Sequence, residues 1–147
     1  MTTRVSNNIT PVKALQTALA AEHAAVYGYG VVGAHGGDAY ARAANRDWNV
    51  HRDHRDQLIA LLQQRHAQPV GSRAGYALPF NVSDPKSAAR LAAHLEDGVA
   101  AAYLQVVAVT DTKLRSFGAR MLRDATLRGA RWGGSTAAFP GMDSAGS

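Results

Sequence analysis

Cysteine is absent from this chain of 147 residues. Its absence excludes a disulfide framework and any metal centre held by thiolates. A chain of this length is long enough to form one domain with a substantial apolar core, so it needs neither kind of cross-link to fold.

Long hydrophobic runs are also absent, and none approaches the ~20 apolar residues that a membrane-spanning helix needs. Residues 1–11 are mostly polar and lack the apolar stretch of a signal peptide. We therefore expect a cytoplasmic protein with no membrane partner, in which residues 1–11 form a flexible lead.

Lysine is scarce, so the formal net charge of +5 comes mainly from arginine. The positive charges are spread along the chain and do not form a block, and for this reason we do not expect a nucleic-acid partner. The abundant alanine and arginine favour helix.

Glutamate occurs only twice, at Glu22 and Glu96, and both positions fall in predicted helices. Large residues recur every three or four positions from Val12 to Tyr29, which is the inward-facing stripe of a packed amphipathic helix. Glu22 takes one place in that stripe, and Glu96 lies at the edge of the apolar face of a later helix. Two isolated carboxylates on core helices predict a polar site inside a helical bundle.

Apolar periodicity and helix-end signals predict four helices within a bundle that spans residues 12–132. The remaining residues, 133–147, are predicted to be a C-terminal tail that can dock through Phe139. The four predicted helices are 12–35, 39–66, 85–109 and 112–132.

The connection over residues 68–83 contains two prolines and two glycines that break any helix. At ~3.3 Å per residue it can reach about 50 Å, which exceeds the roughly 40 Å length of the second predicted helix. Because the other two connections are short, we expect two antiparallel hairpins joined by one full-length crossover. One long crossover is the ferritin-like arrangement, so we predict an all-α, ferritin-like four-helix bundle.

The predicted fold directs attention to a di-metal site, which takes one Glu from each of two helices and a Glu-x-x-His from each of the other two. Glu22 and Glu96 fit the single-glutamate positions. The second helix offers His51 and His54 at the required spacing of three, with histidine in place of the first carboxylate.

The fourth helix completes this pattern poorly. It offers Asp124, but the residue three positions later is Leu127, and no histidine follows His94. The pattern is therefore broken in two places. For this reason we do not expect a working two-metal oxidase, and we expect no cofactor. The alternative is one iron, manganese or zinc ion, with Asp124 as a weak additional candidate beside the ligands Glu22, His51, His54 and Glu96.

A closed ionic network is the competing interpretation of the same residues. A buried carboxylate needs a partner, and the fork of an arginine side chain holds a carboxylate well. We expect Glu22 to pair with Arg55, and Glu96 to pair with Arg128 or His51. Such a network needs no metal, and its arginine cations would repel a divalent ion.

Several segments of the chain resemble a known family, the ferritin-like proteins of unknown function, which are small alanine-rich bundles. The resemblance covers most of the chain and implies the ferritin-like fold without assigning a chemistry. From the wider superfamily it carries over Glu22, Glu96 and one histidine of the second helix, with Asp124 as a fourth candidate. The resembling segments are 18–35 (ALAAEHAAVYGYGVVGAH), 51–58 (HRDHRDQL), 76–82 (YALPFNV), 91–98 (LAAHLEDG) and Trp132 with 139–141 (FPG).

The sequence thus predicts a ferritin-like protein with a degenerate di-metal site and no catalytic activity of its own, assembled as a homodimer. The first alternative is a mononuclear metal-binding protein or a metal-dependent oxidoreductase that uses the residual Glu/His cluster. The second alternative is an adaptor or DNA-binding bundle that acts through its arginine-rich faces.

Overall fold

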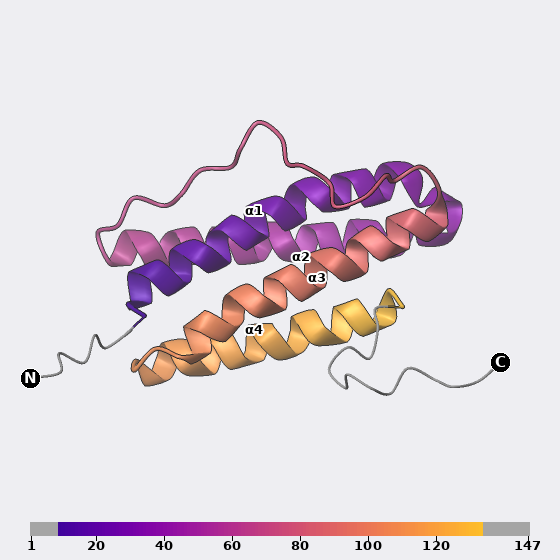
Figure 1. Ribbon diagram of the computed structural model, residues 1–147. Helices are drawn as coiled ribbons and strands as arrows, with labels where there is room; N and C mark the ends of the chain where they lie inside the picture. The colour runs from indigo at the N-terminus through magenta and orange to yellow at the C-terminus, as the bar shows by residue number, and fades with distance from the viewer. Residues whose placement is uncertain (1–8, 134–147) are drawn as a thin grey trace, which may run out of the picture.

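The computed structural model describes residues 9–133, which form a four-helix bundle without any strand in that range. The predicted all-α four-helix class is confirmed. Residues 1–8 and 134–147, with the predicted docking residue Phe139, lie outside the described residues. The four helices are α1 (Pro11–His35), α2 (Gly37–Gln64), α3 (Pro85–Val107) and α4 (Thr112–Arg131) (Figure 1).

Short polar residues fix the N-termini of three helices. The Thr10 side chain accepts a hydrogen bond from the backbone N–H of Lys13 at the start of α1. Asp84 and Ser87 form a reciprocal capping box at the start of α3, and Asp111 caps α4. These caps satisfy backbone donors that have no partner within the helix, which explains why the helices begin where they do.

A glycine turn joins α1 to α2. Gly37 has φ of +64°, a backbone conformation that favours glycine, and its neighbour Gly36 caps both helices. Asp38 lies in the first turn of α2. The turn is so tight that the two helices pack as an antiparallel hairpin.

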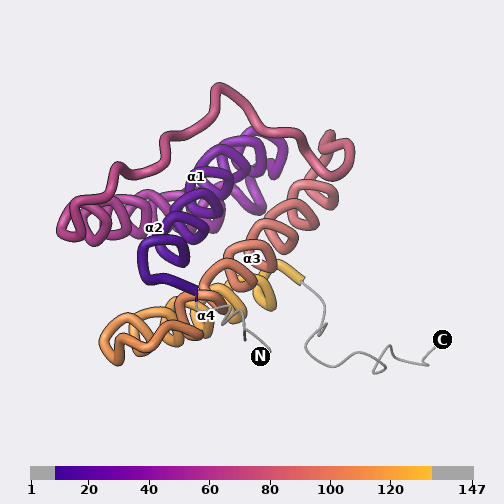
Figure 2. The backbone as a smooth tube through the Cα atoms, turned by 60° about the vertical axis from the view of Figure 1, so that its left-hand side comes forward, coloured from indigo at the N-terminus to yellow at the C-terminus, as the bar shows by residue number. Residues whose placement is uncertain are grey.

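The hairpins α1–α2 and α3–α4 are joined by one crossover over residues 65–84, as the sequence predicts (Figures 1 and 2). The crossover follows the outer face of α1. The Gln16 side chain donates to the carbonyl of Gln68 at 2.7 Å and accepts from the N–H of Val70 at 2.8 Å. His23 Nε2 lies 2.9 Å from the carbonyl oxygen of Val70. These contacts hold the crossover against α1, and Val82 near its end is buried in the core of the bundle.

Close helix packing is visible at two of the glycines. A Cβ atom added to Gly28 of α1 would lie 2.5 Å from Leu95 of α3, and one added to Gly118 of α4 would lie 2.9 Å from Val106 of α3. At Gly30 and Gly33, in contrast, an added Cβ would meet no atom within 4 Å. Among residues 9–133, no helix is both long and apolar enough to cross a membrane.

Candidate functional site

The two glutamates lie in the middle of the bundle on neighbouring helices, Glu22 on α1 and Glu96 on α3. Both side chains are completely buried. A buried carboxylate costs several kcal/mol unless donors replace its lost hydration, so each glutamate requires partners.

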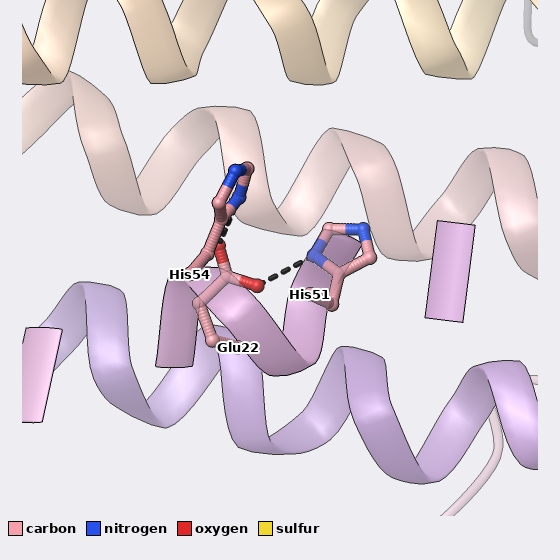
Figure 3. A group of neighbouring side chains, drawn as sticks. All are labelled: Glu22, His51 and His54. Carbon is pink, nitrogen blue, oxygen red and sulfur yellow. Dashed lines mark hydrogen bonds and ion pairs between the residues drawn. The ribbon is translucent and has the colours of Figure 1, made fainter. Parts of the chain in front are cut away.

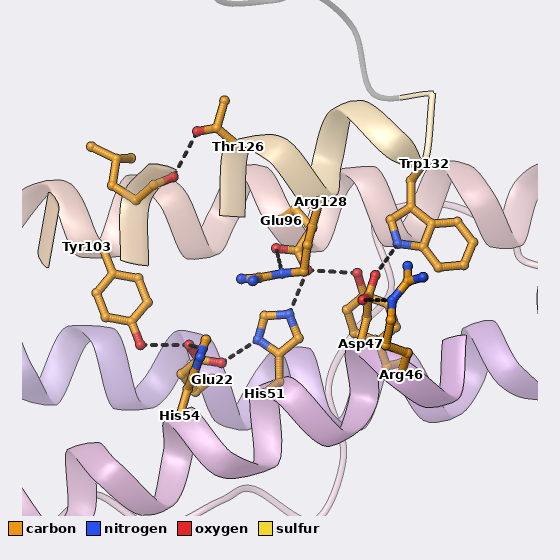
Figure 4. Close-up of polar contacts among 12 residues, drawn as sticks. Glu22, Arg46, Asp47, His51, His54, Glu96, Tyr103, Thr126, Arg128 and Trp132 are labelled. Atoms are coloured by element: carbon orange, nitrogen blue, oxygen red, sulfur yellow. Dashed lines mark hydrogen bonds and ion pairs between the residues drawn. The ribbon is translucent and has the colours of Figure 1, made fainter. Parts of the chain in front are cut away.

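His51 of α2 lies between the two glutamates (Figure 4). Its Nδ1 atom is 2.5 Å from Glu22 Oε2, and its Nε2 atom is 2.6 Å from Glu96 Oε1. Because ionised carboxylates can only accept hydrogen bonds, both ring nitrogens must donate. The geometry therefore makes His51 a positively charged imidazolium that bridges two carboxylates.

Two buried tyrosines complete the contacts in a crossed arrangement. The hydroxyl of Tyr103 on α3 donates a hydrogen bond of 2.7 Å to Glu22 Oε1 on α1. The hydroxyl of Tyr29 on α1 donates a hydrogen bond of 2.7 Å to Glu96 Oε1 on α3. Burial and the neighbouring carboxylates raise the pKa of both phenols. Both hydroxyls therefore stay protonated and serve as donors.

Arg128 of α4 supplies a second positive charge. Its Nε atom lies 3.1 Å from both carboxylate oxygens of Glu96, and its side chain is 6% exposed. Burial by itself would lower the pKa of Arg128, but the charge of Glu96, the hydrogen bond to it and the charge of Glu22 together outweigh burial and raise that pKa. The guanidinium therefore remains charged inside the bundle.

The charges of this network balance. Burial by itself would lower the pKa of His51, but hydrogen bonds to Glu22 and Glu96 and their charges raise that pKa to about 9. Burial by itself would raise the pKa of Glu22, but its hydrogen bond to His51 and the further contacts with His54 and Tyr103 lower it to about 2. At neutral pH two carboxylates thus face one imidazolium and one guanidinium.

His54 gives the same place a metal-binding geometry. Glu22, His51 and His54 offer three ligand atoms that all lie within 4.8 Å of one another (Figure 3). His54 Nδ1 is 3.5 Å from Glu22 Oε1, too long for a hydrogen bond, and it is buried without a hydrogen-bond partner. This donor set fits one iron, manganese or zinc ion once His51 has lost its proton. Glu96 lies outside the group.

Comparison with known proteins places this arrangement in a family. The sequence pattern described as "Domain of unknown function (DUF4439)" matches residues 14–144. The chain belongs to the DUF4439 family. No curated protein shows a significant match to it.

A solved structure resembles this DUF4439 chain over most of its length. It is the crystal structure of a conserved hypothetical protein, rv2844, from Mycobacterium tuberculosis, with 36% sequence identity and a TM-score of 0.79. The match covers 82% of this chain and 92% of the mycobacterial chain. The four-helix fold is therefore shared with this mycobacterial protein.

The structure corrects two of the site residues predicted from the DUF4439 sequence. Arg55 does not pair with Glu22: its Nε atom lies 3.0 Å from Oδ1 of Asp56 on the outside of α2. Asp124 pairs with Arg123 at 3.2 Å and is partly exposed, so it is not part of the buried site. The core stripe of α2 passes between positions 54 and 55. The His54 side chain, 14% exposed, lies beside Glu22, whereas the Arg55 side chain, 27% exposed, lines a groove between α1, α2 and the crossover.

Sequence reasoning missed three residues whose polar groups form buried hydrogen bonds in the DUF4439 fold. Tyr29 and Tyr103 each follow a glutamate by seven residues, and this two-turn spacing on one helix face was the available signal. Asp47 of α2 is the third. It accepts a hydrogen bond of 2.8 Å from Nε1 of Trp132, which ties the end of α4 to α2.

The two halves of this DUF4439 chain repeat one burial pattern at an offset of 74 residues. The offset aligns the start of α1 with the start of α3, because Pro11 and Pro85 are both first helical residues. Comparing the chain with itself would have revealed this repeat. Aligned pairs that are buried in both halves are Ala14 and Ala88, Ala18 and Ala92, Leu19 and Ala93, Glu22 and Glu96, Ala25 and Val99, Gly28 and Ala102, Tyr29 and Tyr103, Val32 and Val106, Ala44 and Gly118, Asp47 and Met121, His51 and Ala125, and Leu58 and Trp132.

Proposed function

We propose that this protein is a non-catalytic ferritin-like bundle in which a charge-balanced network has replaced an ancestral two-metal centre. Two antiparallel hairpins joined by one long crossover support the ferritin-like relationship. Glu22 and Glu96 support it further, because they lie on α1 and α3 and so take the positions of the single glutamates in such a centre.

The residues of the second half do not fit a second metal ion. The repeat aligns His51 with Ala125 and His54 with Arg128. Alanine offers no ligand atom, and arginine offers a permanent positive charge. A divalent ion beside Glu96 would face this guanidinium where the first half has an imidazole.

One observation carries the proposal: the Nε atom of Arg128 lies 3.1 Å from both oxygens of Glu96. This contact neutralises the glutamate that a second metal ion would need. With His51 it also connects the hairpins, because Glu22 and His51 belong to the first hairpin and Glu96 and Arg128 to the second. In this proposal the network links the two hairpins and has no catalytic role, and the biological function is carried by the surface of the bundle.

Metal loading tests the proposal. Protein purified without a histidine tag is dialysed against Fe(II), Mn(II) or Zn(II), and its metal content and thermal midpoint are measured. We expect no stoichiometric metal and no change in midpoint for the natural sequence. The variant Arg128→His should gain metal-dependent stabilisation, because it removes the cation and adds an imidazole beside Glu96. One ion per chain in the natural sequence, lost in Glu22→Gln, would contradict the proposal.

A mononuclear metal site is the second candidate, and the buried Nδ1 atom of His54, which has no hydrogen-bond partner, favours it. In this alternative Glu22, His51 and His54 hold one ion. The ion would compete with the proton that His51 shares with Glu22, so the metal affinity would rise with pH.

The pH dependence separates the two candidates. Under the second candidate, Zn(II) raises the thermal midpoint more at pH 9 than at pH 6, and His54→Ala abolishes the effect. The variant His66→Ala is a matched control, because His66 is exposed at the end of α2. A midpoint that Zn(II) leaves unchanged at both pH values removes this candidate.

A further inference from the structure

A cleft of about 670 Å³ lies at the end of the bundle where α3 begins and α4 ends. Its walls come from the start of α2, the end of the crossover, the first half of α3 and the end of α4. The volume lies within the range of clefts that bind ligands. None of the residues of the buried network lines the cleft, so it is separate from the site described above.

Aromatic rings line this cleft. Those of Tyr40 and Trp132 pack with their centroids 5.5 Å apart. The guanidinium of Arg90 lies over the ring of Phe80, 4.3 Å from the ring centroid. The ring of His94 packs edge-on against the same Phe80 ring, with the two centroids 6.3 Å apart. Such surfaces favour the insertion of another aromatic ring.

The charged residues of the cleft are mostly basic. Lys86, Arg90 and His94 of α3 line it together with a single acidic residue, Asp97. Lys86, Arg90 and His94 are all exposed. The cleft therefore suits an occupant that combines an aromatic group with a negative charge.

We propose that residues 134–147 of this chain occupy the cleft and that Phe139 inserts among its aromatic rings. Gly133 lines the cleft, so the segment starts at its rim. The preceding Trp132 is held by its hydrogen bond to Asp47, which fixes that starting point. Phe139 follows Gly133 by six residues, a reach of ~20 Å that is enough to meet any wall of a cleft of this volume.

Two further observations support this occupant. The DUF4439 match runs to residue 144, so the family pattern includes most of the segment beyond the helices. Asp143 is the only charged side chain in residues 134–147, and its negative charge complements the basic residues of the cleft. The segment therefore offers an aromatic residue, Phe139, and an acidic residue, Asp143, to a cleft that is lined by aromatic rings and basic side chains.

Stability and tryptophan exposure test the proposal in the full chain. Trp48→Phe leaves Trp132 as the single tryptophan, because the chain has two. In this background Phe139→Ala should lower the thermal midpoint by on the order of 5 °C and increase the quenching of Trp132 by acrylamide. The control Thr136→Ala should change neither quantity. An unchanged midpoint and unchanged quenching in Phe139→Ala would overturn the proposal.

Cross-linking gives an independent test, because the chain has no cysteine of its own. Ala138→Cys combined with Ala89→Cys in the cleft wall should form an intramolecular disulfide. Ala138→Cys combined with Ala119→Cys, which is exposed on α4 outside the cleft, should not. Equal disulfide formation in the two pairs would overturn the proposal.

A small aromatic anion is the competing occupant, and benzoate serves as its probe. With residues 134–147 in the cleft, benzoate should raise the thermal midpoint of Phe139→Ala more than that of the natural sequence. An equal rise in both proteins would show that the cleft is open to the anion, and it would overturn docking of the segment.

Discussion

At the scale of single residues, Arg128 and Arg55 differ in environment although both border the inward face of their helices. The Arg128 side chain is almost completely buried and contacts both oxygens of Glu96. The Arg55 side chain is 27% exposed and pairs with Asp56, which is 65% exposed. A buried charge left without its partner is costly, whereas an exposed ion pair contributes little.

We therefore expect Arg128→Ala to lower the free energy of unfolding by about 3–5 kcal/mol, because it leaves Glu96 with too few donors. The matched variant Arg55→Ala should lower it by less than about 1 kcal/mol. Urea denaturation at pH 7 measures both. Equal effects of the two substitutions would show that the network does not depend on Arg128.

The protonation of His51 makes stability depend on pH on the alkaline side. The ordinary pKa of 6.5 applies to the unfolded chain, and the folded state raises it to about 9. The stabilising contribution is therefore complete below pH 6.5 and is lost as the pH rises through 9. We expect the free energy of unfolding to fall by on the order of 2–3 kcal/mol between pH 6.5 and pH 9.5.

Two variants check the origin of this alkaline loss. His51→Gln should remove most of it, and His35→Gln should retain it because His35 is exposed at the end of α1. Glu22 acts on the acid side: its pKa is lowered from 4.5 to about 2, so its contribution is complete above pH 4.5 and is lost as the pH falls through 2. An alkaline slope unchanged in His51→Gln would assign the loss to other groups.

At the scale of helices, the glycines separate close packing from open surface. A Cβ at Gly118 of α4 would lie 2.9 Å from the Cβ of Val106 and 3.0 Å from the backbone nitrogen of Val107. Backbone atoms cannot move aside as the end of a flexible side chain can, so α3 and α4 would have to separate. A Cβ at Gly30 of α1 would meet nothing within 4 Å.

The expected effects of alanine at these two positions have opposite signs. Gly118→Ala should destabilise the chain by about 1–3 kcal/mol through overpacking. Gly30→Ala should stabilise it by up to about 1 kcal/mol, because alanine is the better helix former. Urea denaturation of the two variants measures the difference. A stabilising Gly118→Ala would mean that α3 and α4 are not packed this closely.

The helices and the crossover could be predicted from the sequence because their signals are local. Pro11 and Pro85 mark helix starts, and the connection between α2 and α3 is long enough to span the bundle. Both glutamates and His51 could also be placed in the core, because periodicity shows which residues face inward.

The partners of the buried carboxylates could not be predicted in the same way. Pairing depends on how each helix is rotated about its axis and on how far it lies from its neighbours. His54 and Arg55 are adjacent in the sequence, and a small rotation of α2 decides which of them faces Glu22. Tyr29 and Tyr103 look like ordinary apolar core residues until the opposite helix places a carboxylate at each hydroxyl.

At the scale of the whole molecule, the network lies where the two hairpins meet. The first hairpin contributes Glu22 and His51, and the second contributes Glu96 and Arg128. The near-symmetric halves differ at this point, since His51 and His54 have Ala125 and Arg128 as counterparts. Because of this asymmetry, the interior holds two negative charges, on Glu22 and Glu96, and two positive charges, on His51 and Arg128. The homodimer expected from the sequence stays a prediction.

The protonation state of His51 at pH 7 tests the central claim most directly. Nitrogen-15 NMR of the ring nitrogens measures it, with the resonances assigned by comparison with His51→Gln. The charge-balanced network predicts that both nitrogens carry protons at pH 7 and that the ring titrates with a pKa of about 9. A neutral imidazole at pH 7, with one nitrogen unprotonated, would contradict it.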